Sequence, residues 1–219
     1  MAQIPKRSRS IKAARSARKA AAPPPGLEHR PLAVDPRTHR LRGVRYLPSP
    51  NHDARPNGEI SLLVLHAIAL PPGTYGGPQV AQLFTNTLDH GAHPYFAGLR
   101  DLKVSAHLFI RRDGGMIQFV PFDRRAWHAG ASRFEGRERC NDFSIGIELE
   151  GGDDRPFRAE QYRSLARAVR AILAAYPAVT AARIVGHSDI APGRKTDPGP
   201  HFDWNRLLFA LGPAPREAA

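Results

Sequence analysis

The chain has almost no thiol content and no long apolar run. Its one cysteine, Cys140, cannot form an internal disulfide, which excludes the class of small secreted domains held together by disulfides and favours a reducing compartment. No stretch approaches the roughly 20 apolar residues that span a bilayer, and charged residues stand where a signal peptide has its apolar region. We therefore expect a soluble, cytoplasmic protein. The Arg-, Ala- and Ser-rich stretch 6–22 leaves an organelle transit peptide as the alternative.

Acidic residues are scarce, and the imbalance is concentrated near the N-terminus. The chain holds 32 Lys and Arg against 20 Asp and Glu, a net charge of +12, of which residues 1–43 contribute +9. Dense like charge and three consecutive prolines prevent the segment 6–25 from burying enough surface to fold. Residues 1–43 are therefore predicted to form a disordered basic tail. It is either a solvated tail without a partner or an arm for nucleic acid or an anionic surface.

The rest of the chain has the size and pattern of one domain, expected over 44–212, with 213–219 as a flexible C-terminus. Apolar runs predict strands over 61–66, 104–110, 116–122, 143–150 and 182–187. Helical spacing predicts helices over 78–88 and 162–176, and a last one after Asp203. Asp113-Gly114-Gly115 is typical of a hairpin turn. Strands interleaved with helices predict an α/β (mixed α+β) fold with a central mixed sheet flanked by helices.

The strand 143–150 carries two carboxylates on one face. Because successive strand side chains point to opposite faces, Glu148 and Glu150 share a face with Gly146, which leaves open space beside them. Burying unpaired carboxylates costs several kcal/mol, so this face is not built for packing alone. The strand leaves two readings equally open, a chemical site or an edge that meets solvent.

Histidines end two other predicted strands. His66 and His187 are separated by most of the domain, and the Pro- and Gly-rich loop after His187 adds Lys195 and Asp197. Two histidines and one carboxylate form a workable zinc shell whose fourth position is left for water. The chain has no compact zinc signature such as HExxH, so spacing alone does not establish the site.

Three long motifs identify a family. The runs LHAIALPPG, GRERCNDFSIGIELEG and GHSDIAPGRKTDPGPHFDW closely resemble the AmpD-type 1,6-anhydro-N-acetylmuramyl-L-alanine amidases. These belong to the zinc amidase family related to T7 lysozyme and the peptidoglycan recognition proteins. The resemblance extends in order over residues 44–210. It implies a Zn²⁺ enzyme that hydrolyses the amide bond between (1,6-anhydro-)N-acetylmuramic acid and L-alanine during peptidoglycan recycling, and so indirectly limits β-lactamase induction.

The resemblance also implies a role for individual residues. It places the zinc ligands on His66, His187 and Asp197, the catalytic carboxylate on Glu148 and the basic catalytic residue on Lys195. Substrate-binding positions fall on Trp127, Arg139, Lys103 and Ala67, with the backbone near Ala191 lining the same cleft. The chain departs from the family at Ala67, where Asn is usual, and at Lys103, where Arg is usual, which puts selectivity for the anhydro-sugar in question.

Other polar residues receive lesser roles, and two rival functions stay open. His107 and His128 are expected to be hydrogen-bonded residues of the core or rim, Glu150 a supporting residue, and Cys140 a poor nucleophile. The main rival is a recognition module that keeps the fold and has lost the metal; the complete ligand set argues against it. The second is a nucleic-acid-binding protein acting through its tail. We expect a monomer that takes a small muropeptide substrate and does not insert into a membrane.

Overall fold

The computed structural model describes residues 31–212. The prediction of disorder for residues 1–30 and of flexibility for 213–219 lies outside the described residues. Within the part that is described, no helix is both long and apolar enough to cross a membrane.

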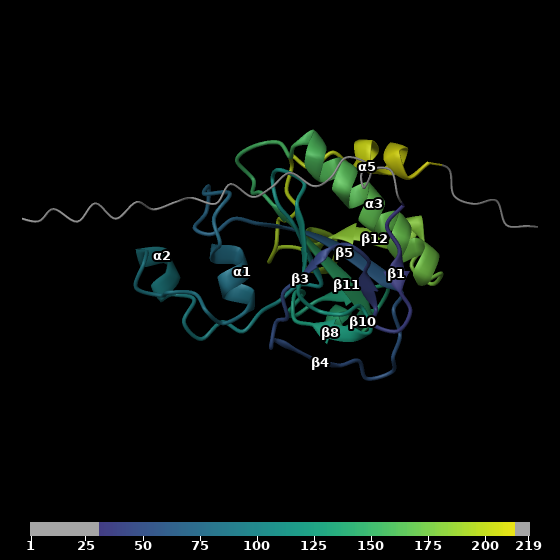
Figure 1. Cartoon of the computed structure of the whole chain (residues 1–219), viewed down its shortest axis with the longest axis horizontal. Helices are drawn as coiled ribbons and strands as arrows, with labels where there is room; N and C mark the ends of the chain where they lie inside the picture. Colours follow the sequence, from purple (N-terminus) through teal and green to yellow (C-terminus); the bar gives the residue numbers. More distant parts are fainter. Residues whose placement is uncertain (1–30, 213–219) are drawn as a thin grey trace, which may run out of the picture. The chain divides into compact units, whose positions relative to one another are not determined.

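The framework is a six-stranded mixed sheet of order β12-β5-β11-β6-β7-β3 (Figure 1). Its four neighbouring strands β12, β5, β11 and β6 run parallel, β7 is antiparallel to β6, and β3 is parallel to β7. The strands are β12 (Ile184–Gly186), β5 (Leu62–Ile68), β11 (Ser144–Glu150), β6 (Leu108–Ile110), β7 (Met116–Gln118) and β3 (Arg45–Tyr46). The predicted mixed sheet is confirmed, as is the hairpin, whose turn holds Gly114 at φ +83°.

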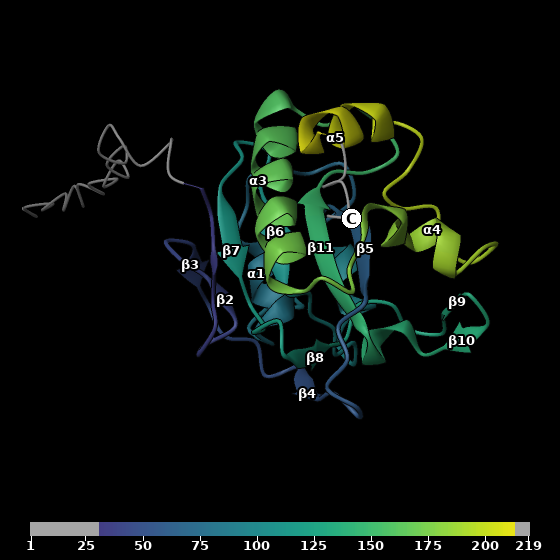
Figure 2. The same ribbon diagram turned by 90° about the vertical axis from the view of Figure 1, so that its right-hand side faces the viewer.

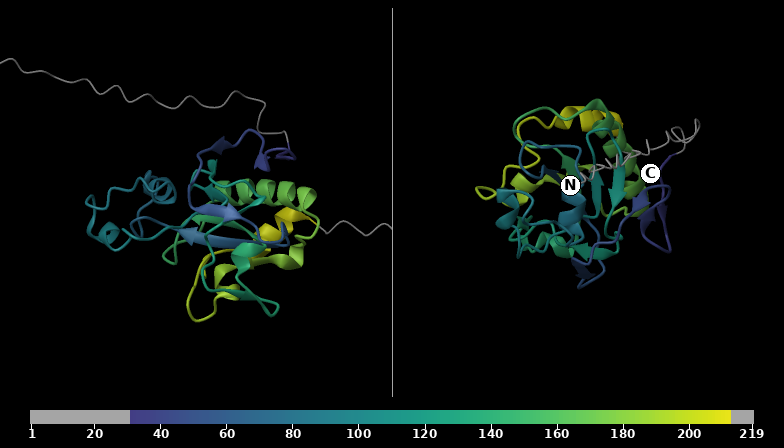
Figure 3. Two further views of the ribbon diagram at one scale, coloured as in Figure 1. Left: turned by 90° about the horizontal axis from the view of Figure 1, so that it is seen from below. Right: turned by 60° about the vertical axis from the view of Figure 1, so that its left-hand side comes forward.

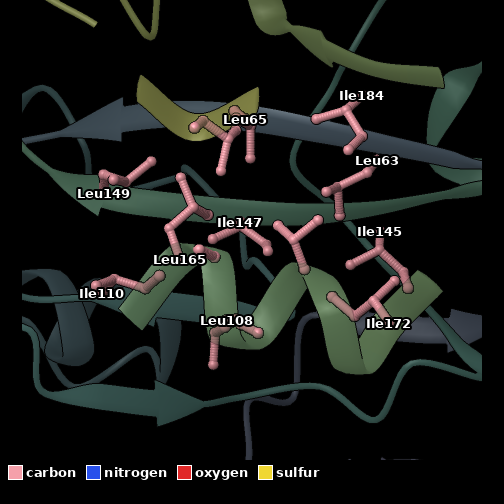
Figure 4. Packing of buried hydrophobic residues seen from close by; sticks show 14 of the residues in the cluster. Leu63, Leu65, Leu108, Ile110, Ile145, Ile147, Leu149, Leu165, Ile172 and Ile184 are labelled. Atoms are coloured by element: carbon pink, nitrogen blue, oxygen red, sulfur yellow. The ribbon is translucent and has the colours of Figure 1, made fainter. Parts of the chain in front are cut away.

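Helix α3 (Ala159–Ala175) covers one face of this sheet (Figure 2). Its apolar stripe, which includes Leu165 and Ile172, packs on Ile145 and Ile147 of β11, as the close view of the core shows (Figure 4). Helix α5 (Trp204–Leu211) joins this cluster through Leu207, and the side chain of Asp203 caps the helix by accepting a hydrogen bond from the Arg206 backbone. Both helices were predicted from their apolar spacing.

The opposite face of the sheet carries a second apolar cluster. Helix α1 (Gln79–Phe84) packs its buried side chains against Phe109 and Ile117 of β6 and β7, and α2 (Pro94–Ala97) adds Phe96. The left view of Figure 3 shows the segment of these two helices extending to one side of the sheet. A third cluster joins Leu62 and Val64 of β5 to residues of the 129–143 segment. Because α3 occupies the first face, the functional side chains that alternate with the core residues of β5 and β11 point to this second face.

Several short elements were not predicted. Three two-stranded pairs are β1 (Val34–Asp35) with β2 (Arg40–Leu41), β4 (His52–Ala54) with β8 (Arg124–Ala126), and β9 (Arg133–Phe134) with β10 (Arg137–Glu138). The first pair lies inside the stretch assigned to the tail. Leu41 is buried in the main core and its backbone N–H donates to the Gln118 side chain, so in residues 31–43 the chain is already part of the folded domain.

Two expectations about the site segments also need correction. All seven residues of β11 are buried, so its polar face is not an open edge, and the space beside Gly146 is filled by the His128 ring. The loop after β12 starts with a one-turn helix, α4 (His187–Ile190), where only irregular structure was expected. Single turns of 3-10 helix at Cys140–Asp142 and Ala181–Arg183 precede β11 and β12.

Candidate active site

Three neighbouring parallel strands bring the chemical groups together. His66 of β5 is the direct register partner of Glu148 on β11, and His187 follows β12, which pairs with β5 on its other side. The carboxyl ends of parallel strands lie at one edge of a sheet, where α/β proteins place their ligands. The order β12-β5-β11 therefore explains how residues distant in sequence reach one place.

Two imidazoles and one carboxylate converge there. The Nδ1 atoms of His66 and His187 lie 3.0 Å apart, and each lies 3.1 Å from Oδ2 of Asp197. Ligand atoms about 2.0–2.1 Å from a tetrahedral zinc ion lie about 3.3 Å from one another. The observed spacing is within a few tenths of an ångström of this value. The donor set therefore fits a metal ion with one open position.

The electrostatics of His66 and Asp197 suit the same task. Burial lowers the pKa of His66 to about 4, and the carboxylate of Asp197 opposes this shift only in part. Burial acts to raise the pKa of Asp197, but the hydrogen bonds of His187 and His66 hold it well below its ordinary value. At neutral pH His66 is thus neutral and Asp197 is ionised. These are the protonation states that a metal ligand needs, so little proton release opposes binding.

Glu148 lies beside His66 on the neighbouring strand and, within residues 31–212, has a buried oxygen without a partner. Its side chain is 8% exposed, and among the described residues its Oε2 has no hydrogen-bond partner. Burial raises its pKa well above the ordinary value, the negative charge of Asp197 raises it further, and the ammonium of Lys195 lowers it. A buried carboxyl with a free oxygen is costly unless a ligand or water occupies it, which makes Glu148 a candidate acid–base group.

A cleft of about 340 Å³ opens over these groups. Its polar end is formed by the three convergent residues with Glu148 and Lys195, and the site residue Ala67 lines it as well. Its other end is apolar and comes largely from the α1–α2 region. The apolar lining includes Leu70, Leu83, Phe84, Tyr95, Leu99 and Leu102. A polar reaction centre beside an apolar wall suits an amphipathic small molecule.

The other predicted substrate residues lie outside the lining of this cleft. Trp127 directs its ring N–H to Asp53, and Ala191 is buried and accepts hydrogen bonds from the Arg194 and Lys195 backbone. Lys103 is exposed. Arg139 is largely exposed at φ +61° and lines a separate hollow of about 420 Å³ with Ser132 and Ile190. Their roles stay predictions.

The remaining polar residues have structural partners. Glu150 accepts hydrogen bonds from the Gly76 and Arg112 backbone, which suits a supporting residue. His107 accepts from the Gly146 backbone through Nδ1. Burial raises the pKa of the Cys140 thiol, which disfavours the nucleophilic thiolate.

Two contacts of His66 and His187 were missed by sequence reasoning. His66 Nε2 lies 2.9 Å from His128 Nδ1, and His187 Nε2 lies 3.0 Å from the Ala129 carbonyl oxygen. Metal-binding histidines regularly use their second ring nitrogen in this way. The signal that could have revealed His128 was Gly146, because a glycine inside a strand often marks the close approach of another group.

Comparisons with known proteins identify the family of this chain. The family described as N-acetylmuramoyl-L-alanine amidase matches residues 56–200. The 1,6-anhydro-N-acetylmuramyl-L-alanine amidase AmpD of Citrobacter freundii is 57% identical over 175 residues, which cover 80% of this chain and 93% of that protein.

Solved structures give the same result. A crystal structure of a selenomethionine derivative of AmpD matches with a TM-score of 0.78 and 55% identity, covering 80% of this chain and 97% of that one. The amidase AmiD of Escherichia coli, in complex with anhydro-N-acetylmuramic acid-L-Ala-D-gamma-Glu-L-Lys, matches with a TM-score of 0.51 and 32% identity, covering 69% and 57%. This chain therefore belongs to the N-acetylmuramoyl-L-alanine amidase family of hydrolases.

Proposed function

We propose that this enzyme uses zinc to hydrolyse the amide bond between (1,6-anhydro-)N-acetylmuramic acid and L-alanine in muropeptides. The convergence of His66, His187 and Asp197 around one point, with the free oxygen of Glu148 beside it, is the observation that carries the proposal. AmpD is a 1,6-anhydro-N-acetylmuramyl-L-alanine amidase, and AmiD has been solved in complex with an anhydro-muropeptide; these two relatives supply the substrate class. A recognition module would have no need for this complete set.

The residues divide the reaction between them. His66, His187 and Asp197 would hold the zinc ion, which when bound would supply a water of lowered pKa and polarise the amide carbonyl. Glu148 accepts the proton of that water and delivers it to the leaving L-alanine nitrogen. The Lys195 ammonium on the cleft wall stabilises the negative charge that develops on the carbonyl oxygen.

The substrate extends beyond the reaction centre. The apolar end of the cleft receives the less polar part of the muropeptide, and Arg139 in the neighbouring hollow pairs with a carboxylate of the peptide stem. We place the enzyme in the cytoplasm, as a monomer that acts on fragments returned during cell-wall recycling. Removal of these fragments would limit β-lactamase induction in bacteria that possess that circuit.

The test is metal-dependent release of peptide from a defined substrate. Zinc-loaded protein incubated with anhydro-muropeptide should release the L-alanyl peptide, detected by mass spectrometry, because the open metal position and Glu148 together activate water. Chelation should abolish the release and added zinc should restore it. A parallel reaction on reducing muropeptide, with and without Ala67→Asn, measures selectivity for the anhydro-sugar. Metal-replete protein that leaves the substrate intact, or activity that chelation does not change, would contradict the proposal.

A further inference from the structure

His128 lines the same cleft and contacts one of the metal histidines. Its Nδ1 is 2.9 Å from Nε2 of His66, the ring nitrogen that faces away from Asp197. Its own Nε2 is 3.2 Å from Oγ of Ser144 at the start of β11. The His66 and His128 rings meet edge to face at an interplanar angle of 81°. The two ring nitrogens of His128 thus contact His66 on one side and Ser144 on the other, and His128 is not one of the three convergent residues.

Metal binding at His66 Nδ1 determines which group donates and which accepts in the hydrogen bonds from His66 to His128 and from His128 to Ser144. A histidine that binds a metal through Nδ1 as neutral imidazole carries its proton on Nε2, so His66 donates from Nε2. His128 Nδ1 must then accept, which leaves the His128 proton on Nε2. That proton points to Ser144 Oγ, which can accept it. All three groups thus have one mutually consistent arrangement.

The surroundings of His128 hold its ring in this position. The side-chain oxygen of Asn141 accepts hydrogen bonds from the backbone N–H of His128 at 3.1 Å and of Ala129 at 2.8 Å. A Cβ on Gly146 would lie 2.5 Å from the His128 ring, so only glycine lets the ring pack against β11. The same short segment offers the Ala129 carbonyl to His187 Nε2. His128 and Ala129, which are held by the Asn141 side chain, therefore contact both metal histidines.

We infer that His128 is a positioning residue that orients His66 for metal binding by accepting its Nε2 proton. The inference rests on the proposed zinc centre and adds a specific hydrogen-bond acceptor behind it. Outer partners of this kind change metal affinity by about 10- to 100-fold when they are removed. The ligands themselves stay in place, so the effect falls on how tightly the ion is held.

Zinc affinity of the full chain, measured by competition with a chromophoric chelator, tests the inference without using activity. His128→Leu removes the acceptor and should weaken zinc binding by about 10- to 100-fold. In His128→Asn the amide oxygen falls near the position of Nδ1 and can still accept, so its affinity should stay within a few-fold of the wild type. In His128→Gln the polar group lies farther out, near the position of Nε2, so this variant should lose affinity as His128→Leu does. His128→Gln keeps a polar side chain. If His128→Leu does not fold, the zinc affinity of His128→Gln compared with His128→Asn tests the inference instead.

His107→Asn is the matched control. His107 is fully buried, whereas His128 is partly buried. His107 contacts the Gly146 backbone and meets the His128 ring edge to face, but it contacts no metal ligand, so this variant should bind zinc as the wild type does. Equal affinity in the wild type and all three His128 variants overturns the inference. If zinc binding is weakened equally in His128→Asn and His128→Leu, His128 does not act as a hydrogen-bond acceptor, and its effect comes from the packing of its ring alone. A wild-type chain that binds no zinc would overturn the metal centre itself, a result distinct from the other two.

Discussion

Glu148 shows how strongly the environment of one residue decides its role. It is the direct register partner of His66 on the neighbouring strand, it is nearly buried, and its Oε2 has no hydrogen-bond partner among the described residues. Glu150, two residues along the same face, has both oxygens engaged by backbone N–H groups. The two carboxylates were indistinguishable from alternation alone. Only their partners separate the group that can exchange a proton from the one that holds loops together.

We predict that Glu148→Gln will lower kcat/KM on anhydro-muropeptide by about 10²- to 10⁴-fold, the usual contribution of a general acid–base group. Zinc stoichiometry should stay at the wild-type level, because the amide replaces a group that is not among the three convergent ligands. Steady-state kinetics and metal analysis measure the two effects. The exposed-charge control Glu160→Gln should leave both unchanged. Retention of activity within about threefold in Glu148→Gln would remove Glu148 from the mechanism.

Sequence reasoning reached some of these residues and not others, for a physical reason. His66, His187 and Asp197 stand in long motifs, and the structure brings them together as the resemblance implied. His128 acts through a contact across the fold, and no local period or motif encodes such a contact. The space beside Gly146 was interpreted as open for the same reason, since the ring that fills it comes from a different segment.

At the scale of elements, the long periodic segments were predictable and the short pairs were not. Strands β5 and β11 and helix α3 are marked by apolar runs or by a helical stripe. The pairs β1–β2 and β4–β8 have only two or three residues per strand, too few to show a period. Leu41 is buried within a basic stretch, so charge density alone set the domain boundary too late.

The turn of the β6–β7 hairpin packs closely against the start of helix α3, and this contact can be tested. Gly114 has φ +83°, and an added Cβ would lie 2.9 Å from the Glu160 carbonyl oxygen at the start of α3. We predict that Gly114→Ala will lower the free energy of unfolding by about 2–3 kcal/mol, from the left-handed backbone and the clash together. Gly136 has φ +82° with open space around it, so Gly136→Ala should cost only about 1 kcal/mol. Denaturant unfolding compares the two variants; equal losses would show that the contact with α3 does not matter.

At the scale of the whole molecule, the site and the core depend on each other. The proposed metal ligands come from β5, from the residue after β12 and from the loop beyond α4, and they meet only when the parallel strands are paired. An unfolded chain therefore has no preformed site, and metal binding should favour the folded state. The ligands, Glu148 and the three apolar clusters all fall within residues 31–212.

The predicted site residues therefore all lie outside the basic N-terminal segment 1–30. Residues 1–30 hold eight Lys and Arg and one acidic residue. We predict that a chain starting at residue 31 will keep its zinc stoichiometry and its kcat/KM, because every predicted site residue and the core that supports them are retained. Binding of the full chain to DNA or to anionic vesicles, if the segment is an arm, should fall steeply with salt and vanish on truncation. Kinetics, metal analysis and a salt titration on both chains distinguish these effects. A large loss of activity on truncation would contradict this prediction. It would mean that residues 1–30 take part in the fold or in the active site.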